Sequence, residues 1–195
     1  MQTFLVCGNF QKSAECLDSK RLSKQNLETR QILNTLCGFS EGWKNHPAVK
    51  QWGGYIWSLI QYGIAINREC IKRGFKDCGE SYVKYFHYCY EHDLGKENPK
   101  WLGIEEIHES HRSRLLCKGE IDVLCAAIKK HFKIKKNDDW CKEKFKLTKN
   151  ALRYEHIAPL KEICLINNIT PSESFYNQFN WSDDPSKPYF WPKMS

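Results

Sequence analysis

The sequence predicts an all-α fold, a single compact helical domain with an extended aromatic C-terminal segment. Apolar residues recur with the 3.6-residue period of an α-helix in several segments, and capping residues, glycine or proline bound most of them. Residues 179–192, in contrast, are rich in proline and aromatic side chains, which favours an extended strap laid over the helical body. With 195 residues and 41% hydrophobic content, residues 1–195 are expected to form one domain with a substantial core.

The first helix is expected between about Ser13 and Cys37, after a short apolar stretch over residues 1–10. Gly38 follows as the residue type that favours a helix stop. The buried face is predicted to carry Leu22, Gln25, Thr29, Ile32, Leu33 and Leu36. Charged and polar residues fall largely elsewhere on this helix, among them Lys20, Arg21, Lys24, Glu28 and Gln31. The segment is therefore a basic, amphipathic helix.

A second helical segment opens at Asn45-His46-Pro47, where a capping residue precedes proline in the first turn, and it runs to about Arg73 before Gly74. Its predicted buried face consists of Val49, Trp52, Ile56, Leu59, Ile60, Gly63, Ile64 and Asn67. Three glycines inside the segment each lower helix propensity by about 1 kcal/mol relative to alanine. A kink or close helix packing is therefore expected near these glycines, which are Gly53, Gly54 and Gly63.

The rest of the chain also favours helices. Residues 81–92 are rich in aromatic side chains and fit either a helix or a strand, although their neighbours favour a helix. Further helices are expected over residues 103–117, 120–133 and 151–167, the last two joined by a polar link near Asn137. Lysines crowd residues 118–170 around a few apolar positions, so this block differs in composition from the rest of the chain.

The chain is basic, since 30 Lys and Arg stand against 23 Asp and Glu and give a net charge of +7. Such a charge favours a polyanionic partner through electrostatic steering and counterion release. Many basic proteins bind no nucleic acid, however, so the charge alone is a weak indication.

Ten cysteines occur without a C-x-x-C pair, which argues against a zinc ribbon or a thioredoxin-like dithiol. No signal peptide opens the chain, so reduced thiols in a cytoplasmic or nuclear protein are expected. No apolar run approaches the roughly 20 residues of a membrane span. His87, Cys89 and His92 do not make a convincing metal site, and no metal is expected. Phosphate-binding, dinucleotide-binding and nucleophile-elbow motifs are also missing from the sequence.

Five motifs follow one another along the chain. They are LDSKRLSKQNLETRQILNTL (17–36), NHPAVKQWGGY (45–55), ECIKRGF (69–75), SHRSRLL (110–116) and FNWSDDPSKPYFWP (179–192). Their order and spacing together resemble the pyrimidine-dimer DNA glycosylase family, the ultraviolet-repair endonucleases of the phage type. The Lys-rich block at 118–170 has no counterpart that can be placed in that family, and it is expected to be an insertion.

The resemblance implies a two-part catalytic site. The acidic residue of the family's first long helix falls on Glu28, and the family's nucleophile is the chain's own N-terminal α-amine. Because glutamine at position 2 disfavours removal of the initiator methionine, the amine belongs to Met1, or to Gln2 if the chain is trimmed. A Gln2 terminus can also cyclise, which would destroy the nucleophile. Lys24, close to Glu28 on the same helix, is a reserve nucleophile.

The chemistry suits these groups. An α-amine, with a reference pKa of about 7.7–8.0, is substantially neutral near physiological pH, whereas a lysine side chain at about 10.4 is not. Attack of the amine at the sugar C1′ would expel the base and form an imine, and proton removal at C2′ would then expel the 3′ phosphate. A carboxylate can stabilise the developing positive charge and carry the proton.

Basic and aromatic residues are the candidate DNA contacts. A solvated helix face, a helix cap and a hydrophobic strap over the core are the ordinary alternatives for them. Leu27 and Gln31 stand where the family places arginines. The sequence therefore does not identify which DNA lesion the protein recognises. The candidates are Lys20, Arg21, Arg30, His46, His111, Arg112, Arg114, Tyr189 and Trp191.

The sequence therefore predicts a DNA glycosylase with abasic-site lyase activity on damaged double-stranded DNA, such as DNA with pyrimidine dimers. It is expected to work as a monomer and without a cofactor. Two other interpretations stay open. One is a noncatalytic nucleic-acid-binding module of the same fold, and the other is a related enzyme that acts on another modified base or on RNA.

Overall fold

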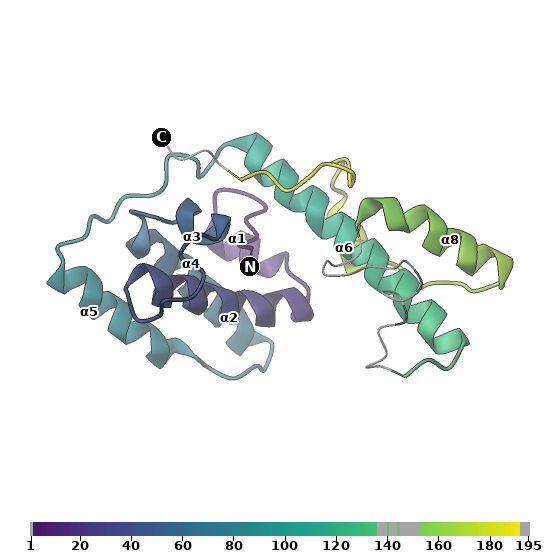
Figure 1. Cartoon of the computed structure of the whole chain (residues 1–195), viewed down its shortest axis with the longest axis horizontal. Helices are drawn as coiled ribbons and strands as arrows, with labels where there is room; N and C mark the ends of the chain where they lie inside the picture. The colour runs from purple at the N-terminus through teal and green to yellow at the C-terminus, as the bar shows by residue number, and fades with distance from the viewer. Residues whose placement is uncertain (1, 136–139, 141–143, 145–152, 192–195) are drawn as a thin grey trace. The chain divides into compact units, whose positions relative to one another are not determined.

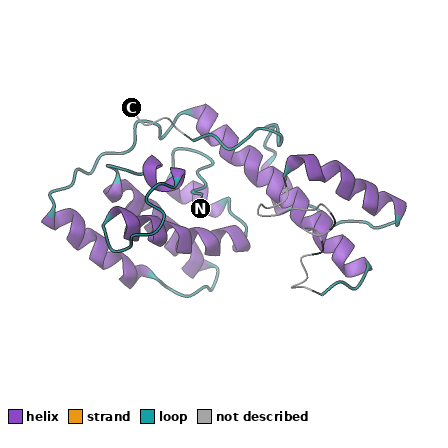
Figure 2. Cartoon of the chain, in the orientation of Figure 1, coloured by secondary structure: helices purple, strands orange, loops and turns teal. Residues whose placement is uncertain are grey.

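Helices form the regular structure of the chain in the computed structural model, which describes residues 2–135, 140, 144 and 153–191 (Figure 2). None of these described residues belongs to a strand, so the predicted all-α fold is confirmed. The α-helices and 3-10 helices (η) in chain order are α1 (Phe10–Glu15), α2 (Ser19–Leu36), α3 (Pro47–Gln51), α4 (Ile56–Lys72), η1 (Gly79–Tyr82), α5 (Val83–Glu91), α6 (Glu105–His131), η2 (Tyr154–His156), α8 (Ile157–Ile166) and η3 (Phe175–Phe179).

The described residues fall into two compact units. The first takes in residues up to His111 together with Phe190 and Trp191, and the second takes in the described part of Arg112–Tyr189. Helix α6 begins in the first unit and continues into the second. The single domain expected over the whole chain stays a prediction.

The predicted first helix is divided in two. Helix α1 ends at Glu15, and α2 begins at Ser19 because Asp18 caps it, accepting a hydrogen bond from the Arg21 N–H over 2.9 Å. Helix α2 ends at Leu36, close to the Gly38 stop signal. The residues predicted on its buried face are buried, except for Leu36, which is half-buried. Glu28, which sequence periodicity assigned to the polar side, is also buried.

The predicted second helix is also divided. His46 caps the short α3, and the chain then turns through residues 52–55, where Gly54 has a φ of 80°. Helix α4 begins at Ile56 and packs against α2 in the core of the first unit (Figure 1). The expected break near the paired glycines and the expected close packing near Gly63 are thus both present, since Gly63 lies directly against the Tyr82 ring.

The C-terminal end of α4 is tied to the turn between α1 and α2. Arg73 donates to the Leu17 carbonyl over 2.6 Å, to the Glu15 carbonyl over 3.0 Å and to Glu69 over 2.7 Å. These bonds satisfy the Glu15 carbonyl, which the C-terminal end of α1 leaves open, and the Leu17 carbonyl in the turn that follows. The ECIKRGF motif, which holds Glu69 and Arg73, therefore has a structural role at this junction.

Residues 83–91 form α5, so the ambiguous aromatic segment is a helix. Helix α6 is continuous from Glu105 to His131, whereas the sequence predicts two helices there. Gly119 does not interrupt α6. A Cβ at this position would lie 2.6 Å from Cδ2 of Tyr176, so glycine is required by close packing of the following segment.

The second unit has its own apolar core between α6 and α8. Its buried side chains are Cys117, Ile121, Leu124, Ile128, Ile157, Leu160 and Cys164.

Part of the Lys-rich block, including the link expected near Asn137, lies outside the described residues. Phe179, the first residue of the expected extended segment, is the last residue of the 3-10 helix η3, and residues 180–191 form neither helix nor strand.

Two further properties concern the described residues as a whole. None of the helices in them is both long and apolar enough to cross a membrane. All nine cysteines in this part of the chain are free thiols, and five of them are buried.

Candidate active site

The N-terminal segment is held by one buried side chain of α2, that of Gln25. This residue is 1% exposed. Its Oε1 accepts hydrogen bonds from the Phe4 N–H over 3.0 Å and from the Tyr62 hydroxyl over 2.8 Å. Its Nε2 donates to the Gln2 carbonyl over 2.7 Å and to Glu28 over 3.2 Å. The position of the first residues relative to α2 is therefore fixed by an amide that can both donate and accept.

Glu28 lies one turn further along α2 and is only 8% exposed. Its Oε2 accepts a hydrogen bond from the backbone N–H of Gln2 over 3.3 Å. Lys24 lies one turn before it and is mostly exposed, with Nζ 3.8 Å from Oε1 of Glu28. Three of the predicted catalytic residues, Gln2, Lys24 and Glu28, are thus brought together. The fourth, Met1, lies outside the described residues.

Trp52, which follows α3, and two histidines of α6 also hold the N-terminal segment. The indole N–H of Trp52 donates to the Thr3 hydroxyl over 3.1 Å. The Leu5 N–H donates to Nδ1 of His111 over 3.0 Å, and the Leu5 carbonyl lies 2.8 Å from Nδ1 of His108. Buried hydrogen bonds of this kind fix an irregular segment without a sheet.

His46 is the cap of α3. Its Nδ1 accepts a hydrogen bond from the Ala48 N–H over 3.1 Å, which requires this nitrogen to be unprotonated. Burial lowers the pKa of His46, and the positive charge of the chain's N-terminal amine lowers it further. The lowered pKa and the bond to Ala48 both favour a neutral imidazole at position 46.

An aromatic corner surrounds His46. Its ring makes an edge contact with Trp43 at a centroid distance of 5.6 Å and another with Trp191 at 6.0 Å. Two of the predicted DNA-contact residues, His46 and Trp191, are thus brought together. Trp43 was not predicted from the sequence. It is 60% exposed and has a φ of 68°, a conformation that costs a bulky residue about 1–3 kcal/mol.

The basic candidates on α2 differ in exposure. Lys20 is exposed. Arg21 pairs with Asp18 over 3.0 Å, and Arg30 donates from Nε to the Asn26 carbonyl of its own helix over 3.0 Å. All three belong to the first unit, as Glu28 does.

Most candidate DNA contacts near the SHRSRLL motif form hydrogen bonds with other groups of the protein itself. His111 is fully buried beneath the N-terminal segment. Arg112 binds both carboxylate oxygens of Asp183, at 2.7 and 2.8 Å. Arg114 donates to the Cys117 sulfur over 3.7 Å and is half-buried, as is Tyr189. Arg112, Arg114 and Tyr189 belong to the second unit.

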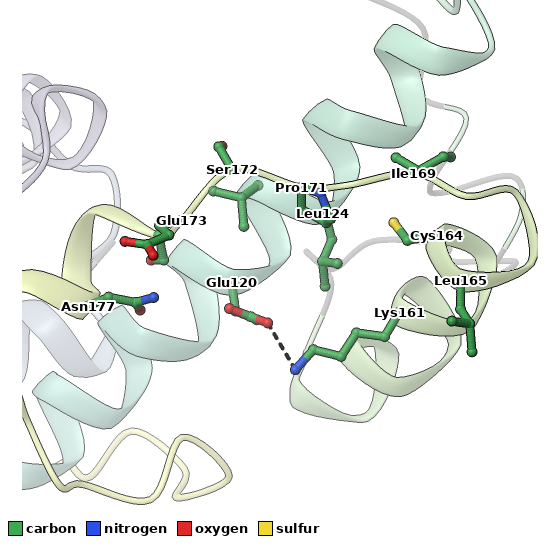
Figure 3. A pocket seen from close by; sticks show the side chains of 12 residues that line it. Glu120, Leu124, Lys161, Cys164, Leu165, Ile169, Pro171, Ser172, Glu173 and Asn177 are labelled. Atoms are coloured by element: carbon green, nitrogen blue, oxygen red, sulfur yellow. Dashed lines mark ion pairs between the residues drawn. The ribbon is translucent and has the colours of Figure 1, made fainter.

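A separate hollow of about 430 Å³ lies in the second unit between α6, α8 and residues 169–177 (Figure 3). Glu120 and Lys161 form an ion pair of 3.0 Å at its wall, and Leu124 and Cys164 add apolar surface. None of the predicted site residues lines it. Among the residues that the structure describes, no group of three or more His, Cys, Asp or Glu side chains could hold a metal ion.

Comparison with known proteins gives one match. Residues 1–80 match the family described as pyrimidine dimer DNA glycosylase. No curated protein and no solved structure matches the chain. The matched range contains the N-terminal segment, Gln25, Glu28 and the aromatic residues before α3. The resemblance predicted from the sequence motifs is thus confirmed, and over residues 1–80 this chain is similar to the pyrimidine dimer DNA glycosylases.

Proposed function

We propose that this protein is a DNA glycosylase with abasic-site lyase activity, acting on double-stranded DNA that contains pyrimidine dimers. One observation carries the proposal. The backbone nitrogen of Gln2 donates to the buried carboxylate of Glu28 over 3.3 Å, in the region that matches the glycosylase family. A carboxylate beside the start of the chain is what amine-based glycosylase chemistry requires.

In the proposed reaction the terminal α-amine attacks the sugar C1′. A C–N bond forms there while the bond to the base breaks, and the base leaves with a proton. Opening of the sugar ring gives a protonated imine. Loss of a proton from C2′ then allows the C3′–O bond to break, which releases the 3′ phosphate, and water hydrolyses the imine. Glu28 stabilises the positive charge at C1′ and accepts or returns protons in these steps.

Gln25 supports this chemistry by positioning. It holds the Gln2 carbonyl and the Glu28 carboxylate through the same Nε2 group, so the start of the chain and the carboxylate keep a fixed separation. Misplacement of a reacting group by about 1 Å can lower a rate by about 100-fold. Gln25 is therefore a positioning residue in the proposed site.

The identity of the reacting amine is the second part of the proposal. The Gln2 nitrogen is a peptide N–H while Met1 is present, and it becomes the α-amine if Met1 is removed. We propose the terminal α-amine, of Met1 or Gln2, as the nucleophile. Lys24, whose Nζ lies 3.8 Å from Glu28, is the alternative amine. Exposed Lys20 and the neighbouring Arg21 and Arg30 are proposed to contact phosphates.

Borohydride trapping tests the proposal. The wild-type protein is incubated with duplexes that carry either a cyclobutane dimer or an abasic site, and the covalent adduct is located by mass spectrometry. We expect trapping on both duplexes, with the adduct on the terminal α-amine, and no adduct after N-terminal acetylation. Trapping that survives acetylation and is lost in Lys24→Arg would assign the nucleophile to Lys24 instead.

The role of Glu28 is tested in the same assay. Glu28→Gln retains a hydrogen-bonding side chain, and we expect it to lower the trapping rate by about 100- to 10,000-fold. Glu80→Gln, at an exposed carboxylate within the same matched range, is the control and should react as the wild type does. If the wild type binds DNA but traps neither substrate, the chain is a noncatalytic binding module.

A further inference from the structure

Trp43 combines two properties that seldom occur together. Its indole is 60% exposed, and its backbone has a φ of 68°, a left-handed conformation that glycine or asparagine adopts far more readily than tryptophan. Gly42 directly precedes it, yet the left-handed turn is made by the tryptophan. Strained residues of this kind cluster at ligand-binding sites, where surrounding contacts hold them in place.

The loop that carries Trp43 is anchored on both sides. The Thr35 hydroxyl on α2 donates to the Gly42 carbonyl over 2.8 Å, and the His46 N–H donates to the Trp43 carbonyl over 2.8 Å. The edge contact with the His46 ring adds a third restraint on the indole itself. The exposed ring is therefore presented in a defined direction.

The loop of Trp43 is anchored on α2, the helix that carries Glu28. Its anchor, Thr35, lies seven residues after Glu28, which is two turns along the same face of α2, or about 10 Å of helix rise. The neighbouring His46 caps α3, which packs against α2. Trp43, His46 and Glu28 all belong to the first unit.

A glycosylase must distort duplex DNA to reach C1′, and distortion leaves at least one base without its stacking neighbour. An exposed indole on a loop that is anchored to α2 can replace that neighbour, because every base has a face that stacks on an aromatic ring. Tyr90 is even more exposed, at 89%, but it lies on the regular helix α5 and has neither the strained backbone nor the contact with His46.

We propose that Trp43 stacks on a base that becomes unstacked when the duplex is distorted at the lesion, and so helps to distinguish damaged from undamaged DNA. This inference rests on the proposed glycosylase function. Stacking by Trp43 would stabilise the distorted complex and would leave the bond-making steps at Glu28 unchanged.

The test compares two substrates in single-turnover reactions. Trp43→Ala should react with dimer-containing duplex about 5- to 150-fold more slowly, the range expected for the loss of one stacked base. The trapping rate of Trp43→Ala at a preformed abasic site should differ from that of the wild type by less than about 3-fold. A base is already missing there, so less stacking has to be replaced. The rate of Trp43→Phe on the dimer duplex should lie between those of wild type and Trp43→Ala. Tyr90→Ala is the matched control, and its rates on both substrates should equal those of the wild type.

Two further measurements separate stacking from a structural role. Trp43→Gly fits the positive φ, so its unfolding temperature should equal or exceed that of the wild type while its reaction with dimer DNA is slow. A 2-aminopurine placed beside the lesion should brighten when Trp43→Ala binds and distorts the duplex, and it should stay darker in the wild-type complex, where the stacked indole quenches it. Equal rates of wild type and Trp43→Ala on dimer DNA, or an equal loss on both substrates, would overturn the inference. Failure of the wild type to trap would overturn the proposed function instead.

Discussion

Gln25 donates one N–H to the Glu28 carboxylate over 3.2 Å and also donates to the Gln2 carbonyl over 2.7 Å. The two side chains lie one turn apart on α2, and both are buried. A single amide therefore links the start of the chain to the carboxylate that the family resemblance implies as catalytic. Replacing Gln25 should therefore lower both the stability of the protein and its trapping rate, and the two losses can be measured independently.

Gln25→Ala should lower the free energy of unfolding by about 2–3 kcal/mol, because the buried Phe4 N–H and Gln2 carbonyl lose their partner. Urea denaturation measures this change. At substrate concentrations that saturate the variant, trapping at an abasic site should also slow, since the N-terminal segment loses its position. Gln31→Ala, at a half-buried glutamine on the same helix, is the control and should change stability by less than about 0.5 kcal/mol. An unchanged trapping rate in Gln25→Ala would contradict the positioning role.

His46 should make the protein less stable as the pH falls below its ordinary pKa of 6.5. Burial and the N-terminal charge lower the folded-state pKa, so the unfolded chain takes up the proton first. Above pH 6.5 both states are neutral at this ring. Between pH 6.5 and the lower folded-state value the free energy of unfolding should decrease, and below that value this contribution should level off.

The variant His46→Asn isolates this effect, because asparagine keeps a capping oxygen for α3 but does not titrate. The difference in unfolding free energy between wild type and variant, measured by urea denaturation from pH 5 to pH 8, should be constant above about pH 7 and shift in favour of the variant at lower pH. A difference that stays constant over the whole range would show that His46 titrates alike in both states.

Much of the fold could be predicted because apolar periodicity records which face of a helix is buried. Five of the six residues predicted on the buried face of α2 are buried. The helix boundaries were less predictable. The break before Ser19 depends on Asp18 as a cap, and α6 continues through Gly119 because packing against Tyr176 requires a residue without a side chain. The continuation of α6 is decided by a contact distant in sequence, whereas the break before Ser19 is a local cap that apolar periodicity does not show.

The candidate site was predictable only in part. Glu28 was identified through the family motif and not through periodicity, which assigned it to the polar side of the helix. Gln25 carried a signal, since a polar residue on an apolar face needs buried partners, but the sequence does not name those partners. Trp43 gave no signal, because a left-handed backbone at tryptophan cannot be inferred from its neighbours.

Gly63→Ala should destabilise the protein although alanine is the better helix former. A Cβ at this position would lie 2.7 Å from the hydroxyl oxygen of Tyr82 and 2.8 Å from its Cζ, and Tyr82 is 1% exposed. Overpacking of this kind costs about 1–3 kcal/mol, against about 1 kcal/mol gained in helix propensity. The unfolding temperature should fall by several degrees, whereas Gly95→Ala, with open space around it, should leave it unchanged. A Gly63→Ala variant as stable as the wild type would mean that the Tyr82 ring can move aside.

The pair formed by Arg112 and Asp183 should be a main stabilising contact within the second unit. Both guanidinium-to-carboxylate bonds are short, at 2.7 and 2.8 Å, and the two side chains are 15% and 7% exposed. Because removal of one partner leaves a poorly solvated charge, Arg112→Ala and Asp183→Ala should each lower the free energy of unfolding by about 3 kcal/mol.

The double variant distinguishes this pairing from a DNA-contact role of Arg112. If the pair is structural, the double variant should be only slightly less stable than either single variant, which gives a large coupling energy in a double-mutant cycle. Arg112→Ala and Asp183→Ala should then weaken DNA binding equally, through stability alone. If Arg112 also contacts a phosphate, Arg112→Ala should in addition reduce the salt dependence of binding by about one counterion, while Asp183→Ala should not. Measured binding from low to moderate salt therefore decides whether this arginine, which the sequence motif nominated for DNA, has any role besides holding the aspartate.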